Sequence, residues 1–207
     1  MQSFHTNYVI KMIFIVFYNF YFFLCFMCGN ELREITDKYR DYIDIFDRIY
    51  TLKTFNEKEI NTLYQDIKSK FLDTKIYTAT YILEKISWTA IFNNRFFKSY
   101  WLLFKKLFDE YHLSNLASIQ DVFRYFVYKE YGILSKDDKT KFDEFDSKKY
   151  SLDVHAKNTI GRAIMDDDLQ LLKKFTEKEG FNLDEGVKSY FYPFPFGNGV
   201  SFLELSC

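Results

Sequence analysis

Three consecutive carboxylates, Asp166, Asp167 and Asp168, are among the few side chains whose types and spacing could do chemistry in this sequence. Carboxylate oxygens bind divalent cations, so the three residues could contribute to a cation site. They also stand between two short stretches with helical spacing, where an Asp commonly caps the helix that follows. We therefore predict capping, and we expect no metal or cofactor site.

The other reactive side chains lack the partners that catalysis needs. His112 could act as a base for Cys207 or for a serine, but the sequence has no nucleophile motif such as GxSxG. We predict that His112 is an ordinary histidine at a helix end, beside a turn. Gly197-Asn198-Gly199 is not followed by the Lys-Ser/Thr of a phosphate loop. The chain is therefore predicted not to be an enzyme and to have no small-molecule substrate, although an undetected helical hydrolase or transferase is an alternative.

The charge balance bears on nucleic-acid binding. With 28 Lys and Arg against 29 Asp and Glu, the net charge is −1, which lacks the basic surplus of a nucleic-acid-binding domain. Aromatic residues make up 21% of the chain, too many for a disordered segment. One aromatic set could stack on bases but is predicted to be core instead: Tyr100, Trp101, Phe104 and Phe108.

The spacing of apolar residues predicts the helices that hold these side chains. Apolar residues recur every three or four positions over 30–52, from an N-cap at Asn56 to 71, over 80–87 and over 96–111. Ser118 is expected to cap a further helix that Gly132 ends, and Lys136–Lys149 is expected to be an exposed connector. No stretch alternates with period two for long enough to suggest a sheet. We predict an all-α, helical bundle-like domain over 30–150.

The first segment, residues 1–28, differs from the rest. Residues 12–28 carry no charge, so 8–28 could be a membrane anchor, although the run is near the lower limit for a span. A cleaved signal peptide and a spurious extension ahead of a start at Met27 are the alternatives. We expect a cytoplasmic protein if translation starts at Met27 and a membrane protein if residues 1–28 are retained. Cys25 and Cys28 form one CxxC pair without a second pair, and inert thiols are predicted.

Residues 152–207 have another organisation. Thr159 opens a short helical pattern, and a second helix after the three Asp residues is expected to end at Gly180. Ser201 then begins a pattern similar to the first helix. Two short helices, a turn-rich extension and a fresh helix are typical of an ankyrin repeat. Because the second pattern stops at Cys207, we predict a truncated ankyrin-type unit over 152–207.

Short motifs along the chain support a family resemblance. They are Lys38–Asp44, Tyr50–Thr54, Asn93–Arg95, Lys98–Tyr100, Tyr128–Ile133, Leu152–His155, Asn158–Ile160, Arg162–Met165, Phe175–Glu177, Glu179–Phe181, Tyr192–Pro193 and Ser201–Leu205. The chain resembles the N-terminal domain of unknown function that precedes ankyrin-repeat arrays in large protozoan protein families of the parabasalid (Trichomonas) type. It looks like a truncated member, and residues 1–26 have no counterpart there. The resemblance implies helical protein–protein scaffolding without catalytic residues.

The expected function is an interaction module with an unknown protein partner; a membrane-tethered helical protein and a non-functional gene fragment are the alternatives. In an ankyrin unit the turn and inner helix usually bind, which would point to Arg162, Met165 and Asp166. Arg162 is also expected to make a structural ion pair, and His155 to be a capping or packing residue. A repeat cut short after Leu205 is expected to leave a face that causes self-association.

Overall fold

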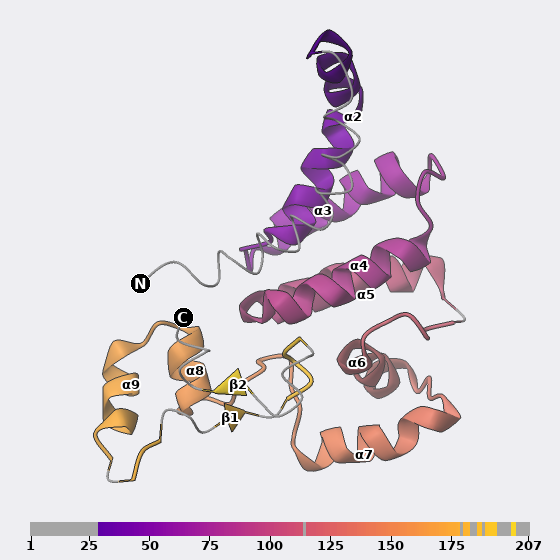
Figure 1. The fold of residues 1–207 in the computed structure, drawn as a ribbon. Coiled ribbons are helices and arrows are strands. Elements are labelled where there is room, and N and C mark those ends of the chain that lie inside the picture. Colours follow the sequence, from indigo (N-terminus) through magenta and orange to yellow (C-terminus); the bar gives the residue numbers. More distant parts are fainter. Residues whose placement is uncertain are drawn as a thin grey trace.

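The described part of the chain is a series of helices with one very short strand pair (Figure 1). The computed structural model describes residues 29–113, 115–178, 180–182, 186–187, 189–193 and 200–201. Its elements are α2 (Gly29–Tyr50), α3 (Glu57–Ile67), the π-helical turn η1 (Lys68–Leu72), α4 (Ala79–Phe92), the 3₁₀ turn η2 (Asn94–Phe96), α5 (Phe97–Tyr111), α6 (Asp121–Tyr131), the 3₁₀ turn η3 (Lys136–Asp138), α7 (Lys139–Ser147), α8 (Ile160–Met165), α9 (Leu169–Thr176), β1 (Gly186–Val187) and β2 (Val200–Ser201). The predicted all-α, bundle-like class is confirmed.

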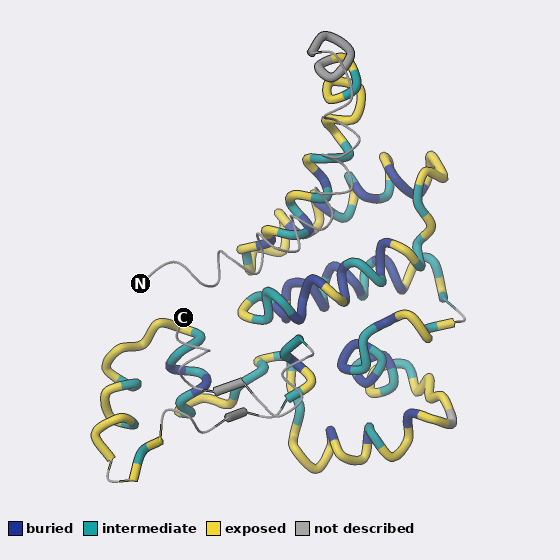
Figure 2. Tube along the Cα trace, in the orientation of Figure 1, coloured by how far each residue is buried: buried dark blue, intermediate teal, exposed yellow. Residues whose placement is uncertain are grey.

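Helices α4 and α5 form the centre of the body. On one side they are covered by α2 and α3, and on the other by α6 (Figure 1). Helix α4 carries apolar residues around most of its circumference, the pattern of a helix buried between neighbours. Burial is greatest along α4, α5 and the inner side of α6 (Figure 2). The aromatic set predicted to be core, at positions 100, 101, 104 and 108, is buried here as expected.

Several helix ends follow the predicted chemistry. The Asn56 side chain accepts a hydrogen bond from the Lys58 backbone N–H at 3.0 Å, which starts α3 as predicted. Gly132 ends α6 at a φ of +70°, a conformation that glycine adopts without strain. His112 ends α5, in agreement with its predicted place beside a turn.

Three predicted helix boundaries are wrong. The helix predicted over 80–87 is α4, which continues to Phe92. Ser118 lies in a turn, and α6 begins only at Asp121 with Gln120 as its N-cap residue. Helix α9 ends at Thr176, before Gly180, because Glu177 already closes the last turn with its backbone N–H on the carbonyls of Lys173 and Phe175.

The predicted exposed connector over Lys136–Lys149 is also wrong, because most of it is the helix α7. Phe142 and Phe145 are buried and pack their rings against Tyr125, with centroids 5.6 and 5.4 Å from its ring. These two aromatic residues, three positions apart, hold this short, highly charged helix on α6 together with the ion pairs Lys129–Asp146 and Lys141–Asp121.

Several described residues of the region over 152–207 pack on the body. Helices α8 and α9 contact each other, and the segment after them returns to the core. Phe191 is buried, with its ring edge-on to Phe97 at 4.9 Å and stacked on Tyr150 at 5.0 Å. The Asn94 side-chain amide donates to the Phe191 carbonyl at 3.0 Å. The core is therefore continuous across the boundary between 30–150 and 152–207 that the sequence pattern suggests.

Among the described residues, no helix combines the length and the apolar character needed to cross a bilayer. The predicted anchor over 8–28, with Cys25 and Cys28, lies outside the described residues, as do Gly197–Gly199 and 202–207. Ser201, the expected opening of a second unit, pairs with Gly186 in the β1–β2 strand pair.

Candidate interaction surface

The connector between α2 and α3 is fixed by the corner at which α4 turns into α5. The Leu52 carbonyl accepts a hydrogen bond from the Asn93 side-chain amide at 2.8 Å, and the Leu52 side chain is buried. The Thr54 carbonyl accepts one from the Ser99 hydroxyl at 2.6 Å. These bonds hold the backbone of the connector in one place, although it is neither helix nor strand.

The outer side of the same connector is exposed. Phe55 has 61% of its surface accessible, and its ring lies 5.0 Å from that of Phe96. Lys53 is exposed and forms no ion pair with the described residues. An aromatic ring already held by a neighbour loses little freedom on binding, so the connector presents a ready contact.

An ion pair joins this corner to the turn between α8 and α9. Arg95 contacts the Asp167 carboxylate at 2.8 Å, across 72 positions of sequence. Asp167 sits in the turn with a φ of +56°. Leu169, in the first turn of α9, is 74% exposed. Because the ion pair is itself exposed, we expect it to contribute less than about 1 kcal/mol to stability.

The three predicted capping carboxylates have three different partners. Asp168 accepts the Leu171 backbone N–H at 2.9 Å, which confirms the predicted cap. Asp166 accepts a hydrogen bond from Arg162 Nε at 2.6 Å, and Asp167 accepts one from Arg95. No cluster of three His, Cys, Asp or Glu side chains suited to a metal ion occurs within the described residues.

The predicted interaction residues lie beside this turn. Arg162 is half-buried and makes the predicted structural ion pair, with Asp166. Met165 is half-buried and Asp166 is exposed. We call the set that includes them the corner surface, and it consists of Lys53–Phe55, Asn94–Phe96, Arg162 and Met165–Leu169.

Sequence reasoning missed Phe55, Phe96 and Leu169, the apolar members of the corner surface. The available signal concerned Phe55, which directly precedes the helix cap Asn56. An apolar residue at that place usually packs inward against the first turns of its helix, as a hydrophobic staple. Here its ring lies on Phe96 instead and stays largely exposed.

His155 packs behind the corner surface, as predicted. Its ring lies so close to Gly161 that a Cβ there would be 2.6 Å from the ring atoms Cε1 and Nδ1. A ring nitrogen shares a hydrogen bond with the Tyr192 hydroxyl. Burial, followed by the nearby Arg162 guanidinium, lowers the pKa of His155 from its ordinary value. The histidine therefore favours its neutral form in the folded protein.

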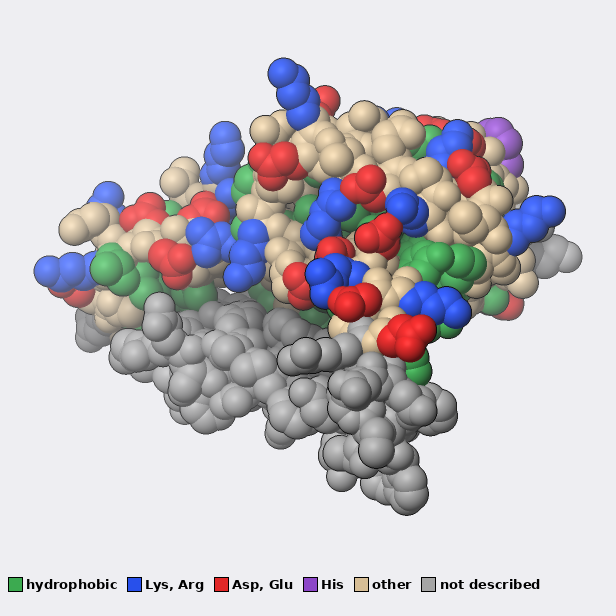
Figure 3. Space-filling view, turned by 90° about the horizontal axis from the view of Figure 1, so that it is seen from above, with side chains coloured by type: hydrophobic (Ala, Val, Ile, Leu, Met, Phe, Trp, Pro, Cys, Tyr) green, Lys and Arg blue, Asp and Glu red, His purple; other side chains and the backbone are tan. Residues whose placement is uncertain are grey.

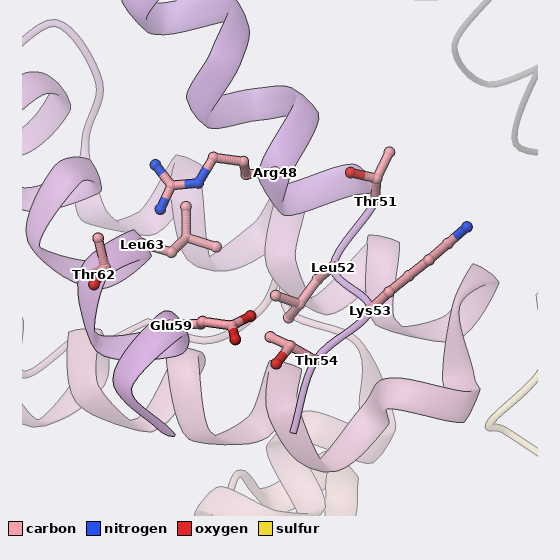
Figure 4. Close-up of a pocket in the computed structure, with 8 residues that line it drawn as sticks. All are labelled: Arg48, Thr51, Leu52, Lys53, Thr54, Glu59, Thr62 and Leu63. Carbon is pink, nitrogen blue, oxygen red and sulfur yellow. The ribbon is translucent and has the colours of Figure 1, made fainter. Parts of the chain in front are cut away.

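A hollow of about 370 Å³ opens beside the connector (Figure 4). The buried side chains of Leu52 and Leu63 give it an apolar part. Arg48, at its edge, is paired with Asp66 at 2.5 Å. Lys53 extends away from Glu59 in this view, so the two opposite charges do not meet across the hollow (Figure 4). Threonines at positions 51, 54 and 62 supply hydroxyl groups around it.

The charged side chains do not separate by sign on the face seen from above in Figure 3. Lys and Arg alternate with Asp and Glu there, with hydrophobic side chains between them. Such a mixed surface matches the near-neutral net charge and does not favour a polyanion.

Comparison of the chain with family models, with curated proteins and with solved structures finds no match. The resemblance to the ankyrin-associated protozoan domain therefore stays a prediction.

Proposed function

We propose that this protein is a non-enzymatic protein–protein interaction module that binds a partner through the corner surface, in the manner of a scaffold of the ankyrin-repeat class. The observation that carries the proposal is that the Arg95–Asp167 ion pair joins two segments that each carry an exposed apolar side chain. Phe55 packs on Phe96, the neighbour of Arg95, and Leu169 follows Asp167 by two positions. Exposed apolar side chains beside charged groups are the combination that binding sites use, with apolar residues at the centre and polar residues at the rim.

The residues Arg162, Met165 and Asp166 belong to the same proposal. They share one side of α8 by their helical spacing, and Asp166 is the residue before the bridging Asp167. The side chains of the Asp trio and of His155 are all used in caps, ion pairs or packing. This use supports a binding role over a catalytic one.

The proposal is tested by proximity labelling with the full chain fused to a labelling enzyme in its native cell. We expect Phe55→Ser and Leu169→Ser each to remove the same proteins from the labelled set. Ile133→Ser is the matched control, because Ile133 is 44% exposed in a loop outside the corner surface. Equal labelled sets for all variants would contradict the proposal.

Tethering to a membrane through residues 8–28 is a second candidate, favoured by the uncharged run over 12–28. The intact mass of the endogenous chain, taken from separated soluble and membrane fractions, decides it. A chain starting at Met27 in the soluble fraction supports a cytoplasmic module. A full-length chain in the membrane fraction supports a tethered module, and absence of any chain supports a gene fragment.

A further inference from the structure

We propose that the connector over Leu52–Phe55 binds an extended partner segment that carries an acidic residue and an apolar residue two positions apart. The inference rests on the proposed interaction role and names the chemistry of the partner at the same surface. Pairing of a peptide with an exposed extended backbone is a common mode of recognition.

The connector has the pattern of an edge strand. Burial alternates along it: Leu52 is buried and Lys53 exposed, and then Thr54 is half-buried and Phe55 exposed. Side chains that alternate between inside and outside are characteristic of extended backbone. Asn56, the next residue, has extended dihedral angles, with a φ of −78° and a ψ of 113°.

The backbone of the connector is bonded on its inner side only. The carbonyls of Leu52 and Thr54 are held by Asn93 and Ser99. Within the described residues, the N–H and C=O groups of Lys53 and Phe55 have no hydrogen-bond partner. These groups are available to a second extended chain, and the inner bonds keep them in place before it binds.

The two outward side chains define what that chain should carry. Lys53 forms no ion pair with the described residues, so a carboxylate opposite it gains a charge partner without displacing one. Phe55 offers a ring to an apolar or aromatic side chain. Lys53 and Phe55 are two positions apart, and directly opposite residues interact across strands, so the partner's acidic and apolar residues should have the same separation.

The test measures the binding of a fluorescein-labelled peptide, Ser-Thr-Phe-Thr-Glu-Thr-Ser, to the full chain by fluorescence anisotropy. A second peptide has Lys in place of Glu, and a third has methylated backbone nitrogens. We expect the first peptide to bind, the methylated one not to bind, and Phe55→Ser to remove binding. Lys53→Glu should weaken binding of the first peptide roughly fivefold and strengthen binding of the lysine peptide.

Lys139→Glu is the matched control, since Lys139 is an exposed lysine on α7. Equal effects of Lys53→Glu and Lys139→Glu would show general charge attraction and overturn the inference. Equal binding of the methylated peptide would overturn it as well. If proximity labelling depends on Phe55 but no peptide binds, the interaction role stands and the extended-segment partner does not.

Discussion

At the residue scale, the ring of His155 occupies the space in which a side chain at position 161 would lie, so Gly161 depends on its neighbour. Glycine inside a helix normally destabilises it by about 1 kcal/mol relative to alanine. Here an alanine Cβ would meet the imidazole ring at 2.6 Å. We expect Gly161→Ala to lower the free energy of unfolding by about 1 to 3 kcal/mol, because the ring or α8 must move.

Urea unfolding of a double-mutant cycle checks this expectation. In a His155→Ala background the ring is gone, and Gly161→Ala should then be neutral or stabilising. A stabilising effect of Gly161→Ala in both backgrounds would show that the contact with His155 does not constrain the glycine.

His155 also makes stability depend on pH. Burial and then Arg162 lower its pKa below the ordinary 6.5, so the unfolded chain binds a proton at a higher pH than the folded protein does. The free energy of unfolding should therefore fall as the pH drops below about 6.5. His155→Gln should remove this loss, and urea midpoints across the range from about pH 7.5 to 5 will show whether it does.

Carboxylates act in a separate pH window. Hydrogen bonds from Lys68 and Tyr64 lower the pKa of Glu110 from 4.5, and bonds from Lys129 and Tyr125 lower the pKa of Asp146 from 3.8. Their contribution is present above those ordinary values and is lost only at lower pH. A wild-type profile that is flat between about pH 6.5 and 5 would contradict the role given to His155.

At the scale of elements, α7 depends on two aromatic side chains. Phe145 is buried, with its ring 4.6 Å from that of Tyr150. Arg124 of α6 adds an ion pair at 2.7 Å to Asp138, just before α7. We expect Phe145→Ala to cost about 3 to 5 kcal/mol and to open α7 to proteolysis at its lysines.

Asp143→Ala is the matched control, because Asp143 is exposed on the same helix. It should change the free energy of unfolding by less than about 0.5 kcal/mol. Equal protease resistance of Phe145→Ala and wild type would mean that α7 does not need its aromatic anchor.

The sequence predicted most of the helices, including the short α8 and α9, but missed the second half of α4 and all of α7. In α2, α3 and α5 many apolar residues repeat with helical spacing, and each added turn strengthens the pattern. Helix α7 has only Phe142 and Phe145 among charged residues, so its pattern was too short to separate from a connector.

Some contacts of the candidate site could likewise be predicted from the sequence and others could not. The Arg162–Asp166 pair could be predicted because the two residues are one helical turn apart. The contacts Arg95–Asp167 and Phe55–Phe96 join distant parts of the chain, and local periodicity carries no information about them. The exposure of Lys53 and Phe55 could not be predicted either, because it depends on the hydrogen bonds that Asn93 and Ser99, both distant in sequence, donate to the connector.

At the scale of the whole molecule, Phe191 ties the two regions into one core. It contacts Phe97 and Tyr150 of the body and is fully enclosed. We expect Phe191→Ala to lower the free energy of unfolding by about 3 to 5 kcal/mol. Because the core is shared, the loss should reach the body as well as α8 and α9.

Two probes measured on one urea series test this coupling. The fluorescence of Trp88 in α4 and Trp101 in α5 reports on the body, and protease cleavage at the lysines of α9 reports on the other region. Both midpoints should shift together in Phe191→Ala. A shift confined to cleavage in α9 would show that the two regions unfold independently.

The late position of Phe191 has a consequence for synthesis of the protein. During translation, α2 to α7 leave the ribosome well before residue 191 does, and their shared core still lacks one of its rings. The hydrogen bond between the Asn94 amide and the Phe191 carbonyl spans 97 positions, so it cannot form until residue 191 has left the ribosome. The body of the nascent chain should therefore lack its complete core until residue 191 has left the ribosome.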